Sequence, residues 1–586
     1  MTIDINLSSE SESESTCDED EDYDLYEPSF DISLCPNNAL NLRETSFVEE
    51  EFEIEAENDD PSSQIEEDIE GVEVESPYVK HIDIMEESDF LIKDETCIVY
   101  LNCLKTLAEI KINKSCTRKS CSSPVDLHSK FVGSAVYFKW ICTNGHLNNK
   151  WCSLPILKNK LHGGDLLMST ALLASGNNYA KIALLAKFLK LHILNVNTYY
   201  RIQRKYLVPA VTELWEDTQK EILTAHEGKD VVLLGDGRMD SPGHSAQFCT
   251  YTMMDNADKS ILSIMTIDKR ETEGKSTLME KVGFQKSVSF LKQQNVNVVE
   301  CVTDAHLQIG ALMKNEYPDI KHSHNIWHAA KNLAKALVAA GQKKDCKVLL
   351  SWSKDIVNHF WHTCETSKTY DEFLGIWCGI LHHVVDEHQW ALSYSDVGTA
   401  SCSHRPLESE RQKGWMTKGH PAHNALRKIV LNNRFLKKIP YWLNFRGTAE
   451  LENFHQCILM YAAKRFHYSP PMYKVRNLLA ALDYTANHQR EIKKNKDGTT
   501  RYQRLFNKKS KRWTVVPVKE EKDYSYIQKL VEMVVYRRLL DETSLKTVTG
   551  LGEDDPRRLS RNIASVPALP THQLVEEKLS RFKKKL

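Results

Sequence analysis

The chain has 586 residues, of which 41% are hydrophobic and 27% are charged, and its formal net charge is −4. This length is too great for one compact core and predicts about two to four folded units. No apolar run approaches the roughly eighteen residues of a membrane helix, and the N-terminal stretch is acidic, unlike a signal peptide. We therefore expect a soluble protein of the cytosol or nucleus, with no membrane partner.

Residues 1–90 are predicted to be an acidic, disordered tail. They include SSESESESTCDEDEDYDLYE and FVEEEFEIEAENDD, which are rich in Asp, Glu and Ser. Such a composition cannot bury enough apolar surface to offset the entropy of the chain. The acidic tail offsets the positive charge of the rest of the chain in the net charge. A basic surface suits polyanionic partners, although a single run of charge is more often a solvated face.

Residues 91–160 are predicted to form a small zinc-knuckle module. Cys116 and Cys121 form a C-x4-C pair, and Cys142 and His146 form a C-x3-H pair. Between them lies the strand-like SAVYFKWIC, and TNG supplies a turn. Two such pairs can bind one structural, tetrahedral Zn²⁺ ion, because a tight turn closes each pair in advance. The alternative ligands are Cys103, His128 and Cys152.

Residues 161–226 are predicted to be helical and to resemble a helix-turn-helix. Breaks at SGNN and LNVNT leave a short helix between two others, and the last helix begins at an Asn/Thr cap in NVNTYYRIQRKY. In a helix-turn-helix the last helix enters the major groove of DNA. Ordinary helical packing explains the apolar residues equally well. The basic residues assigned to DNA contact are Arg201, Arg204 and Lys205.

Residues 227–490 are predicted to form an α/β domain with a mixed sheet. The first strand, DVVLLGD, is apolar and is expected to end at Gly235. The elements follow in the order β-β-β-α-β-α-β-α. The further strands are expected at residues 246–255, 260–269 and 296–306, the helices at 277–295 and 307–317, and a short strand running into a long helix at 320–328.

Two acids accompany these strands. The element order is that of the ribonuclease-H fold, in which the first and fourth strands are neighbours, so Asp236 and Asp304 are expected to lie side by side. Two desolvated carboxylates repel each other, and a divalent cation relieves the repulsion. Gly235 and Gly237 would let a phosphate backbone come close. This arrangement suits two-metal phosphoryl transfer, with the ions roughly 3.5–4 Å apart.

A third acid is expected from a later helix that opens with Thr448. That helix contains Glu450 and Glu452, which lie about 200° apart around its axis, so only one can face the sheet. Glu452 shares a face with His455 and is the one that we assign to the site.

These motifs together resemble those of DDE transposases with a ribonuclease-H core, in particular eukaryotic transposase-derived proteins related to bacterial insertion-sequence transposases. The resemblance covers roughly residues 95–490. It consists of the knuckle, the stretch DGRMDSPGHSA, the second Asp after a strand, a WH-x-x-K-x-L helix, LE-x-FH and Y-x-x-K-R. The matching residues outside the acids are Cys142, His146, Trp151, Trp327, His328, Lys331, Leu333, Phe454, His455, Tyr461, Lys464 and Arg465.

The resemblance implies that Asp236, Asp304 and Glu452 hold two Mg²⁺ or Mn²⁺ ions, which activate water or a DNA 3′ hydroxyl for strand cleavage and transfer. It also implies DNA as the partner, no small-molecule substrate and a nuclear location. Lys464 and Arg465 are assigned to DNA contact. A homodimer is expected by analogy with enzymes that act on two DNA ends.

Two alternatives stay open. Asn325 stands where the family pattern often has Asp, two residues before the Trp-His pair, which favours an inactive, domesticated DNA-binding or chromatin regulator. A metal-dependent exonuclease would usually have a further acid two residues after the first, and that position is Arg238. Asp240 would orient Arg238, support the metal-binding acids from behind, or cap a turn.

An all-α insertion is predicted at about residues 335–445, where aromatic and apolar residues recur at helical intervals. Two groups of histidines are conceivable metal sites, although ordinary core or surface histidines are the commoner interpretation of each. The first group is His322, His324 and His328, and the second is His382, His383 and His388.

Residues 491–586 are predicted to be basic and partly disordered. Their first part interleaves Lys and Arg with Tyr, Phe and Trp. This combination suits contact with a nucleic-acid backbone or a nuclear-import signal, and a solvated, flexible tail is an equally good interpretation.

Overall fold

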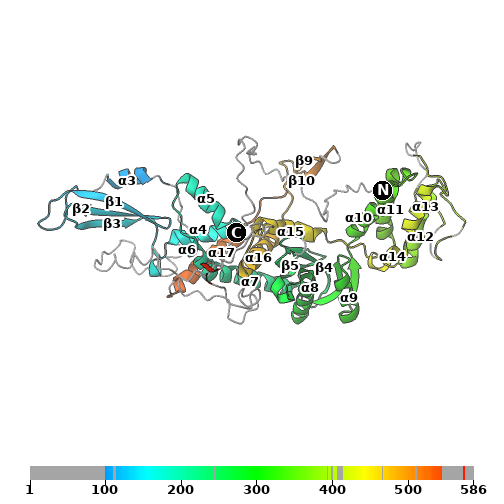
Figure 1. Ribbon diagram of the computed structural model, residues 1–586, viewed down its shortest axis with the longest axis horizontal. Coiled ribbons are helices and arrows are strands. Elements are labelled where there is room, and N and C mark those ends of the chain that lie inside the picture. The colour runs from blue at the N-terminus through cyan, green and yellow to red at the C-terminus, as the bar shows by residue number, and fades with distance from the viewer. Residues whose placement is uncertain are drawn as a thin grey trace, which may run out of the picture. The chain divides into compact units, whose positions relative to one another are not determined.

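The structure is a computed structural model that describes residues 99, 101–109, 114–242, 245–391, 393–396, 400–404, 414–464, 466–507, 511–543, 545, 570 and 572–573 (Figure 1). The predicted acidic tail at residues 1–90 lies outside these described residues. The chain divides into two compact units. Among these described residues, the helical unit comprises those within 323–447 and 490–520, and the sheet unit comprises those within 99–322, 448–489 and 521–573. None of the described helices is both long and apolar enough to cross a bilayer.

The first described part of the sheet unit is helix α3 (Leu101–Glu109) followed by a three-stranded antiparallel sheet in the order β1-β2-β3. Its strands are β1 (Val125–Val132), β2 (Ala135–Cys142) and β3 (Leu147–Cys152). The β-branched and aromatic stretch SAVYFKWIC forms β2, as predicted. Gly145 has a φ of 77° in the turn between β2 and β3, so the predicted TNG turn is confirmed.

A series of helices follows in the sheet unit. They are η2 (Lys158–Lys160), α4 (Gly163–Ala174), α5 (Tyr179–Leu189), α6 (Val196–Ile202), the π-helical turn η3 (Gln203–Leu207) and α7 (Val208–His226). The Asn195 side chain accepts a hydrogen bond from the Thr198 backbone N–H, which confirms the predicted cap. Because η3 joins α6 directly to α7, the last helix of this segment continues to His226.

A five-stranded mixed sheet forms the centre of the sheet unit, in the order β6-β5-β4-β7-β8. Its elements in chain order are β4 (Asp230–Met239), β5 (Phe248–Asp255), β6 (Ile261–Asp268), η5 (Lys269–Thr272), α8 (Ser276–Gln293), β7 (Asn297–Thr303), α9 (Leu307–Glu316) and β8 (Lys321–His324). Strand β4 runs antiparallel to β5 and parallel to β7, so the predicted element order and the adjacency of the first and fourth strands are confirmed. The predicted end of β4 at Gly235 is wrong, because β4 stays paired with β5 as far as Met239.

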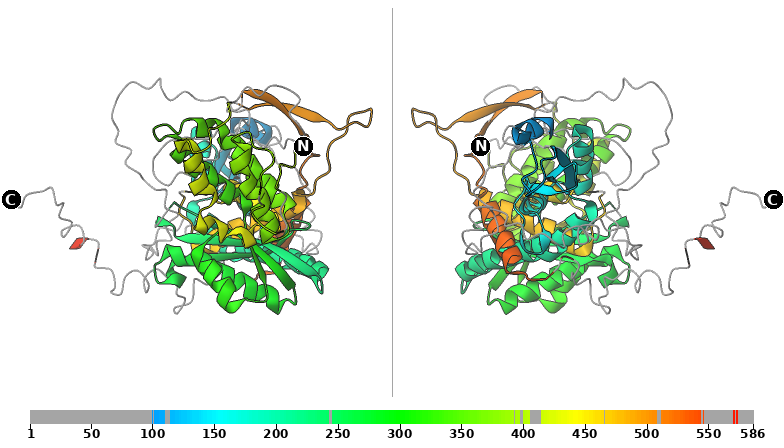
Figure 2. Two further views of the ribbon diagram at one scale, coloured as in Figure 1. Left: turned by 90° about the vertical axis from the view of Figure 1, so that its right-hand side faces the viewer. Right: turned by 90° about the vertical axis from the view of Figure 1, so that its left-hand side faces the viewer.

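Helices cover both faces of this sheet. Leu233 of β4 packs in a buried cluster with Phe284 of α8, whereas its neighbour Leu234 packs in another cluster with Leu479 of α16. Figures 1 and 2 show α8 on one side of the sheet and α15 (Ala449–Tyr461) and α16 (Pro470–Asn487) on the other. Strand β4 therefore lies between helices from two distant parts of the sequence.

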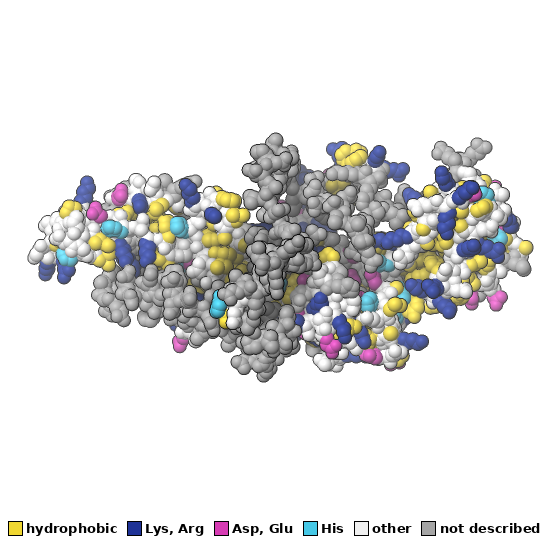
Figure 3. All heavy atoms as spheres, in the orientation of Figure 1, with side chains coloured by type: hydrophobic (Ala, Val, Ile, Leu, Met, Phe, Trp, Pro, Cys, Tyr) yellow, Lys and Arg dark blue, Asp and Glu magenta, His cyan; other side chains and the backbone are white. Residues whose placement is uncertain are grey.

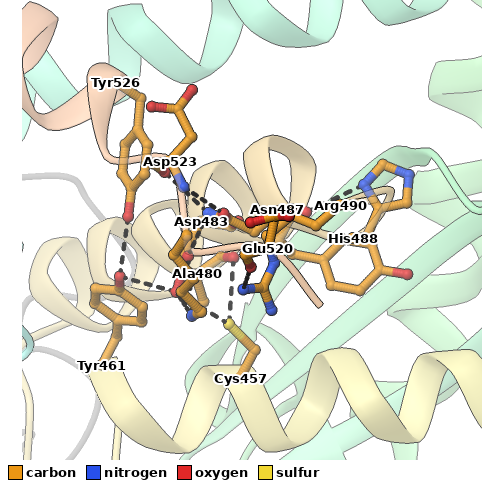
Figure 4. A network of polar contacts seen from close by, with 12 residues as sticks. Cys457, Tyr461, Ala480, Asp483, Asn487, His488, Arg490, Glu520, Asp523 and Tyr526 are labelled. Atoms are coloured by element: carbon orange, nitrogen blue, oxygen red, sulfur yellow. Dashed lines mark hydrogen bonds and ion pairs between the residues drawn. The ribbon is translucent and has the colours of Figure 1, made fainter. Parts of the chain in front are cut away.

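A buried carboxylate ties α17 (Ser525–Leu540) to the rest of the sheet unit. Asp483 of α16 accepts hydrogen bonds from Asn487 (3.0 Å) and Tyr461 (3.3 Å), and the Lys522 ammonium lies 2.9 Å from its Oδ2. Asn487 also accepts a hydrogen bond from the Asp523 backbone N–H (2.8 Å), as Figure 4 shows. These bonds fix the start of α17 against α15 and α16.

The helical unit has a buried core of its own, which includes Trp352, Phe360 and Trp377. Its elements are α10 (Ile326–Gly341), α11 (Val348–Thr366), α12 (Tyr370–His383), α13 (Pro421–Val430), α14 (Asn433–Leu436), η6 (Ile439–Tyr441), β9 (Tyr502–Asn507) and β10 (Arg512–Pro517). Strands β9 and β10 pair as an antiparallel hairpin. The basic stretch after residue 490 thus contains regular structure, where the sequence left open a flexible tail.

Candidate functional site

Asp236 and Asp304 lie on neighbouring strands, as expected. Leu234 of β4 is paired with Val302 of β7, Asp236 stands two residues further along β4, and Asp304 is the first residue after β7. Burial raises the pKa of Asp236 well above its usual value, and the charge of Asp304 raises it further. The two carboxylates are therefore close enough to repel each other.

Glu280 of α8 is a fourth acid at this position, and our sequence analysis missed it. Burial and the charge of Asp304 raise the pKa of Glu280 to about 7, and Glu280 in turn raises the pKa of Asp236. A Cβ atom on Gly237 would stand only 2.8 Å from Cγ of Glu280. The glycine therefore makes room for this carboxylate.

The two acids of α15 have different surroundings. Tyr484 donates a hydrogen bond to Glu450 (2.8 Å), whereas the charge of Glu452 contributes to the raised pKa of Asp236. The structure thus brings Glu452 together with Asp236, Asp304 and Glu280, and it ties Glu450 to α16. We call these four carboxylates the acidic site.

A largely buried imidazole borders the acidic site. Nδ1 of His455 lies 3.5 Å from Oδ2 of Asp236, and its Nε2 is buried with no hydrogen-bond partner among the described residues. Burial, together with the charges of Arg238 and Lys464, lowers the pKa of His455 to about 3. His455 is therefore neutral at physiological pH and offers a nitrogen that can accept or donate one hydrogen bond.

The glycines beside Asp236 have a different role from the one that the sequence suggested. A Cβ atom on Gly235 would stand 2.8 Å from the Tyr251 hydroxyl, and Gly237 faces Glu280. Both positions are filled by side chains of the same unit, so the expected close approach of a phosphate backbone at these glycines is not supported. Their small size serves the packing of β4 against β5 and α8.

The residues that follow Asp236 are structural. Arg238 is buried and donates hydrogen bonds to the Ala462 carbonyl (3.1 Å) and the Tyr473 hydroxyl (3.4 Å). Asp240 accepts hydrogen bonds from the backbone N–H groups of Gln247 (2.9 Å) and Phe248 (3.1 Å). Of the three roles considered for Asp240, the structure supports the turn cap.

The carboxylates of the acidic site are not gathered tightly around a single point. Within the described part of the chain, it is not among the groups of three or more side chains whose ligand atoms all lie within 4.8 Å of one another. The elements that supply it are β4, the residue after β7, α8 and α15. Such a site gathers negative charge, which a cation or a hydrogen-bond donor can neutralise.

The knuckle residues Cys116, Cys121, Cys142 and His146 have their ligand atoms within 4.8 Å of one another and can hold a metal such as zinc. The sulfurs of Cys121 and Cys142 are 4.0 Å apart, and Cys116 Sγ is 3.8 Å from Nδ1 of His146. Tetrahedral zinc places two sulfurs about 3.8 Å apart and a sulfur and a nitrogen about 3.6 Å apart. Hydrogen bonding by the Ser123 hydroxyl lowers the pKa of Cys121 to about 6, which favours the thiolate that binds metal.

The alternative knuckle ligands stand apart from this group. Cys152 interacts with His162, and His128 is exposed on β1. The described residues that form the ligand group do not include either of them. The side chain of Cys103 lies outside the described residues.

The basic residues assigned to DNA differ in their surroundings. The Lys205 ammonium lies 2.6 Å from Asp541 and donates to Thr543, so its charge is paired within the sheet unit. Arg201 lies in the last turn of α6 and is partly exposed. Arg204, in η3, is also partly exposed. Lys464 is exposed just after α15, and Arg465 lies outside the described residues.

The first group of histidines shows ordinary contacts. His322 pairs with the Thr303 hydroxyl (2.9 Å), His324 stacks on Tyr441, and His328 lies edge-on to Trp327. None of the three belongs to a metal-ligand group in the part of the chain that the structure describes.

Comparison with known proteins adds no assignment. No protein-family model matches the sequence, and no curated protein is significantly similar to it.

Proposed function

We propose that this chain is a transposase-like, DNA-binding protein that cleaves and transfers DNA strands in a metal-dependent reaction at the acidic site. The observation on which this proposal rests is the convergence of Asp236, Asp304, Glu280 and Glu452 from four separate elements. A fold gains nothing in stability from collecting four repelling carboxylates, so their juxtaposition favours a function. The strand order β6-β5-β4-β7-β8, in which β6, β5 and β4 are antiparallel and β7 runs parallel to β4, is that expected of a ribonuclease-H-like domain.

Divalent cations suit this site. Carboxylates supply the hard oxygen ligands that Mg²⁺ and Mn²⁺ prefer. A cation would relieve the repulsion that, together with burial, raises the pKa values of Asp236 and Glu280. Asp236, Asp304 and Glu452 would hold two ions, and Glu280 would join them. The ions would supply an activated oxygen nucleophile and neutralise charge on the phosphate. The chain's own carboxylates would position the ions, and the neutral His455 would orient Asp236.

In the helical unit, we assign DNA contact to the hairpin β9–β10, and in the sheet unit, taken by itself, we assign it to the knuckle and the exposed Lys464. Phe506 is paired with Trp513, and Arg504 is paired with Val515, so these side chains share one face of the hairpin. Trp513 is 71% exposed and Phe506 is 48% exposed. Figure 3 shows hydrophobic and basic side chains together at this hairpin. Exposed aromatic rings beside Arg suit stacking on bases and pairing with phosphates. DNA as the partner agrees with the proposed nuclear location and with a homodimer that would hold two DNA ends.

A catalytically inactive DNA-binding regulator is the second candidate. It is favoured by the open arrangement of the carboxylates and by Asn325, which is buried and caps α10 by accepting a hydrogen bond from the Trp327 backbone N–H. Asn325, at the position that often carries Asp in the family pattern, is the N-cap of α10 in this chain.

A strand-transfer assay separates the two candidates. The full-length chain would be incubated with labelled duplexes that carry candidate terminal inverted repeats, in Mg²⁺, Mn²⁺ or EDTA. If the chain is an enzyme, we expect nicked and joined products in the presence of metal. Both products should be lost with Glu452→Gln and retained with Glu450→Gln, the matched control. Binding of the duplex without products in either metal would overturn the enzymatic proposal and support the regulator.

A further inference from the structure

A second group of metal-binding side chains lies in the helical unit. It consists of His383, the last residue of α12, His388 just after it, and Cys402 and His404 from the connection to α13. Their ligand atoms all lie within 4.8 Å of one another. The sequence suggested His382, His383 and His388 as a group, but His382 instead contacts Glu387 (2.7 Å) and Tyr394 (2.9 Å).

The separations inside this group match one tetrahedral ion. Nδ1 of His383 is 3.2 Å from Nε2 of His404 and 3.6 Å from Sγ of Cys402. Zinc bonded to nitrogen at about 2.05 Å and to sulfur at about 2.3 Å, with tetrahedral angles, separates two nitrogens by about 3.3 Å and a nitrogen and a sulfur by about 3.6 Å. The three imidazole rings are also mutually close, with centroids 5.0 or 5.1 Å apart.

His388 is oriented as a ligand with an outer partner. Its Nε2 lies 3.2 Å from Oδ1 of Asp386, and its Nδ1 is buried with no hydrogen-bond partner among the described residues. Histidine ligands of zinc commonly donate their second nitrogen to a carboxylate, which fixes the tautomer and directs the other nitrogen at the metal. The unpartnered Nδ1 of His388 is therefore the atom available to an ion.

The backbone holds the two pairs of side chains together. Gln389 and Ser401 form an antiparallel bridge, and the Cys402 backbone N–H donates to the His388 carbonyl (3.0 Å). Trp415 lies edge-on to His383 and His388, with centroids 5.7 Å away, and shields one side of the group. A hydrogen bond between His383 and His404 would explain their short separation. It would not explain why Cys402 and His388 lie at the same point.

We propose that His383, His388, Cys402 and His404 bind a structural zinc ion, distinct from the ion of the knuckle. One thiolate and three imidazoles, all from protein, fill a tetrahedral shell and leave no position for a substrate. The ion would fasten the long connection between α12 and α13, whose regular structure in the described residues is a single bridge. This proposal does not depend on the enzymatic activity of the acidic site.

Zinc content of the purified full-length chain tests the proposal. Mass spectrometry of the metal is expected to find about two zinc ions per chain, and about one in His404→Asn, in Cys402→Ser and in Cys142→Ser. The control His382→Asn, next to a ligand but bonded elsewhere, should keep both ions. The proposal is overturned if His404→Asn and Cys402→Ser both retain the wild-type zinc content.

A spectroscopic measurement covers the case in which a ligand variant fails to fold. In full-length Cys142→Ser only the second site remains, and zinc K-edge absorption should show one sulfur at about 2.3 Å and three nitrogens at about 2.0–2.1 Å. In the His404→Asn chain only the zinc of the knuckle should remain, and its absorption should show mostly sulfur ligands. A Cys142→Ser chain that binds no zinc, or binds it through oxygen ligands alone, would sink the proposal.

Discussion

Nδ1 of His455 lies 3.5 Å from Oδ2 of Asp236, and the two side chains come from α15 and β4, more than two hundred residues apart in the chain. The pKa of the imidazole is lowered to about 3, mainly by burial, so this contact joins a neutral ring to an acid. We therefore expect His455 to position Asp236. The neutral ring does not neutralise the charge of the Asp236 carboxylate, so a cation can still bind there.

Removing His455 is expected to weaken Mn²⁺ binding without abolishing it. Loss of an outer partner of a metal ligand typically lowers affinity by about 10–100-fold, and His455→Ala should fall in this range. Asp236→Ala should remove calorimetrically detectable binding, because it deletes a ligand, whereas Glu450→Gln should match the wild type. Equal Mn²⁺ affinity in wild type and Asp236→Ala would exclude the acidic site as the binding position.

The sequence could predict Asp236 and Asp304 because strand patterns and their order fix which strands are neighbours. Glu280 could not be predicted in the same way, since it lies in an ordinary helical stretch, TLMEKVGFQ, with no motif around it. Its position depends on how closely α8 crosses β5. Gly283 allows that approach, because a Cβ atom there would stand 2.6 Å from Cβ of Tyr251.

The second metal-ligand group shows the same limit. His383 and His388 stand close together in the sequence, but Cys402 and His404 join them only through the backbone bridge of Gln389 with Ser401. By contrast, the knuckle pairs are joined by one hairpin, whose strands could be predicted from local composition. Ligand pairs joined by irregular chain leave no periodic pattern.

The exposed face of the hairpin β9–β10 should contribute to DNA affinity. Trp513→Ala is expected to weaken binding of a single-stranded oligonucleotide by about 1–3 kcal/mol, because one stacking platform is lost. Arg504→Gln should reduce the slope of log affinity against log salt by about 0.7, since one phosphate contact disappears. Fluorescence anisotropy at several salt concentrations measures both effects. Thr514→Ala, on the opposite face, is the control, and a loss equal to that of Trp513→Ala would show that the face is irrelevant.

Lys522→Met is expected to destabilise the sheet unit by on the order of 2 kcal/mol. It leaves Asp483, whose side chain is fully buried, with hydrogen bonds but no counter-charge. Removing one partner of a fully buried pair costs about 3–5 kcal/mol, and the estimate is lower here because the Lys522 side chain is 34% exposed. Urea unfolding followed by circular dichroism measures the change. The double variant Asp483→Asn with Lys522→Met should recover part of the loss, and no recovery would mean that the ion pair is not the cause.

His162 should make the stability of the sheet unit depend on pH. Burial alone would lower the pKa of His162, but the carboxylate of Asp165, 3.2 Å away, and the neighbouring Cys152 outweigh burial and raise it to about 9. Because the folded chain holds this proton more tightly than the unfolded chain, the stabilisation is complete below the ordinary value of 6.5 and is lost as the pH rises through about 9.

The variant His162→Gln isolates this effect, because any pH dependence of the zinc sites is common to both chains. The unfolding free energy of the wild type should exceed that of His162→Gln by on the order of 3 kcal/mol more at pH 6 than at pH 10. Urea titrations at both pH values measure the two differences, with His128→Gln, exposed on β1, as a control for loss of a histidine. A difference that stays constant with pH, or that grows as the pH rises, would show that His162 is not protonated in the folded chain.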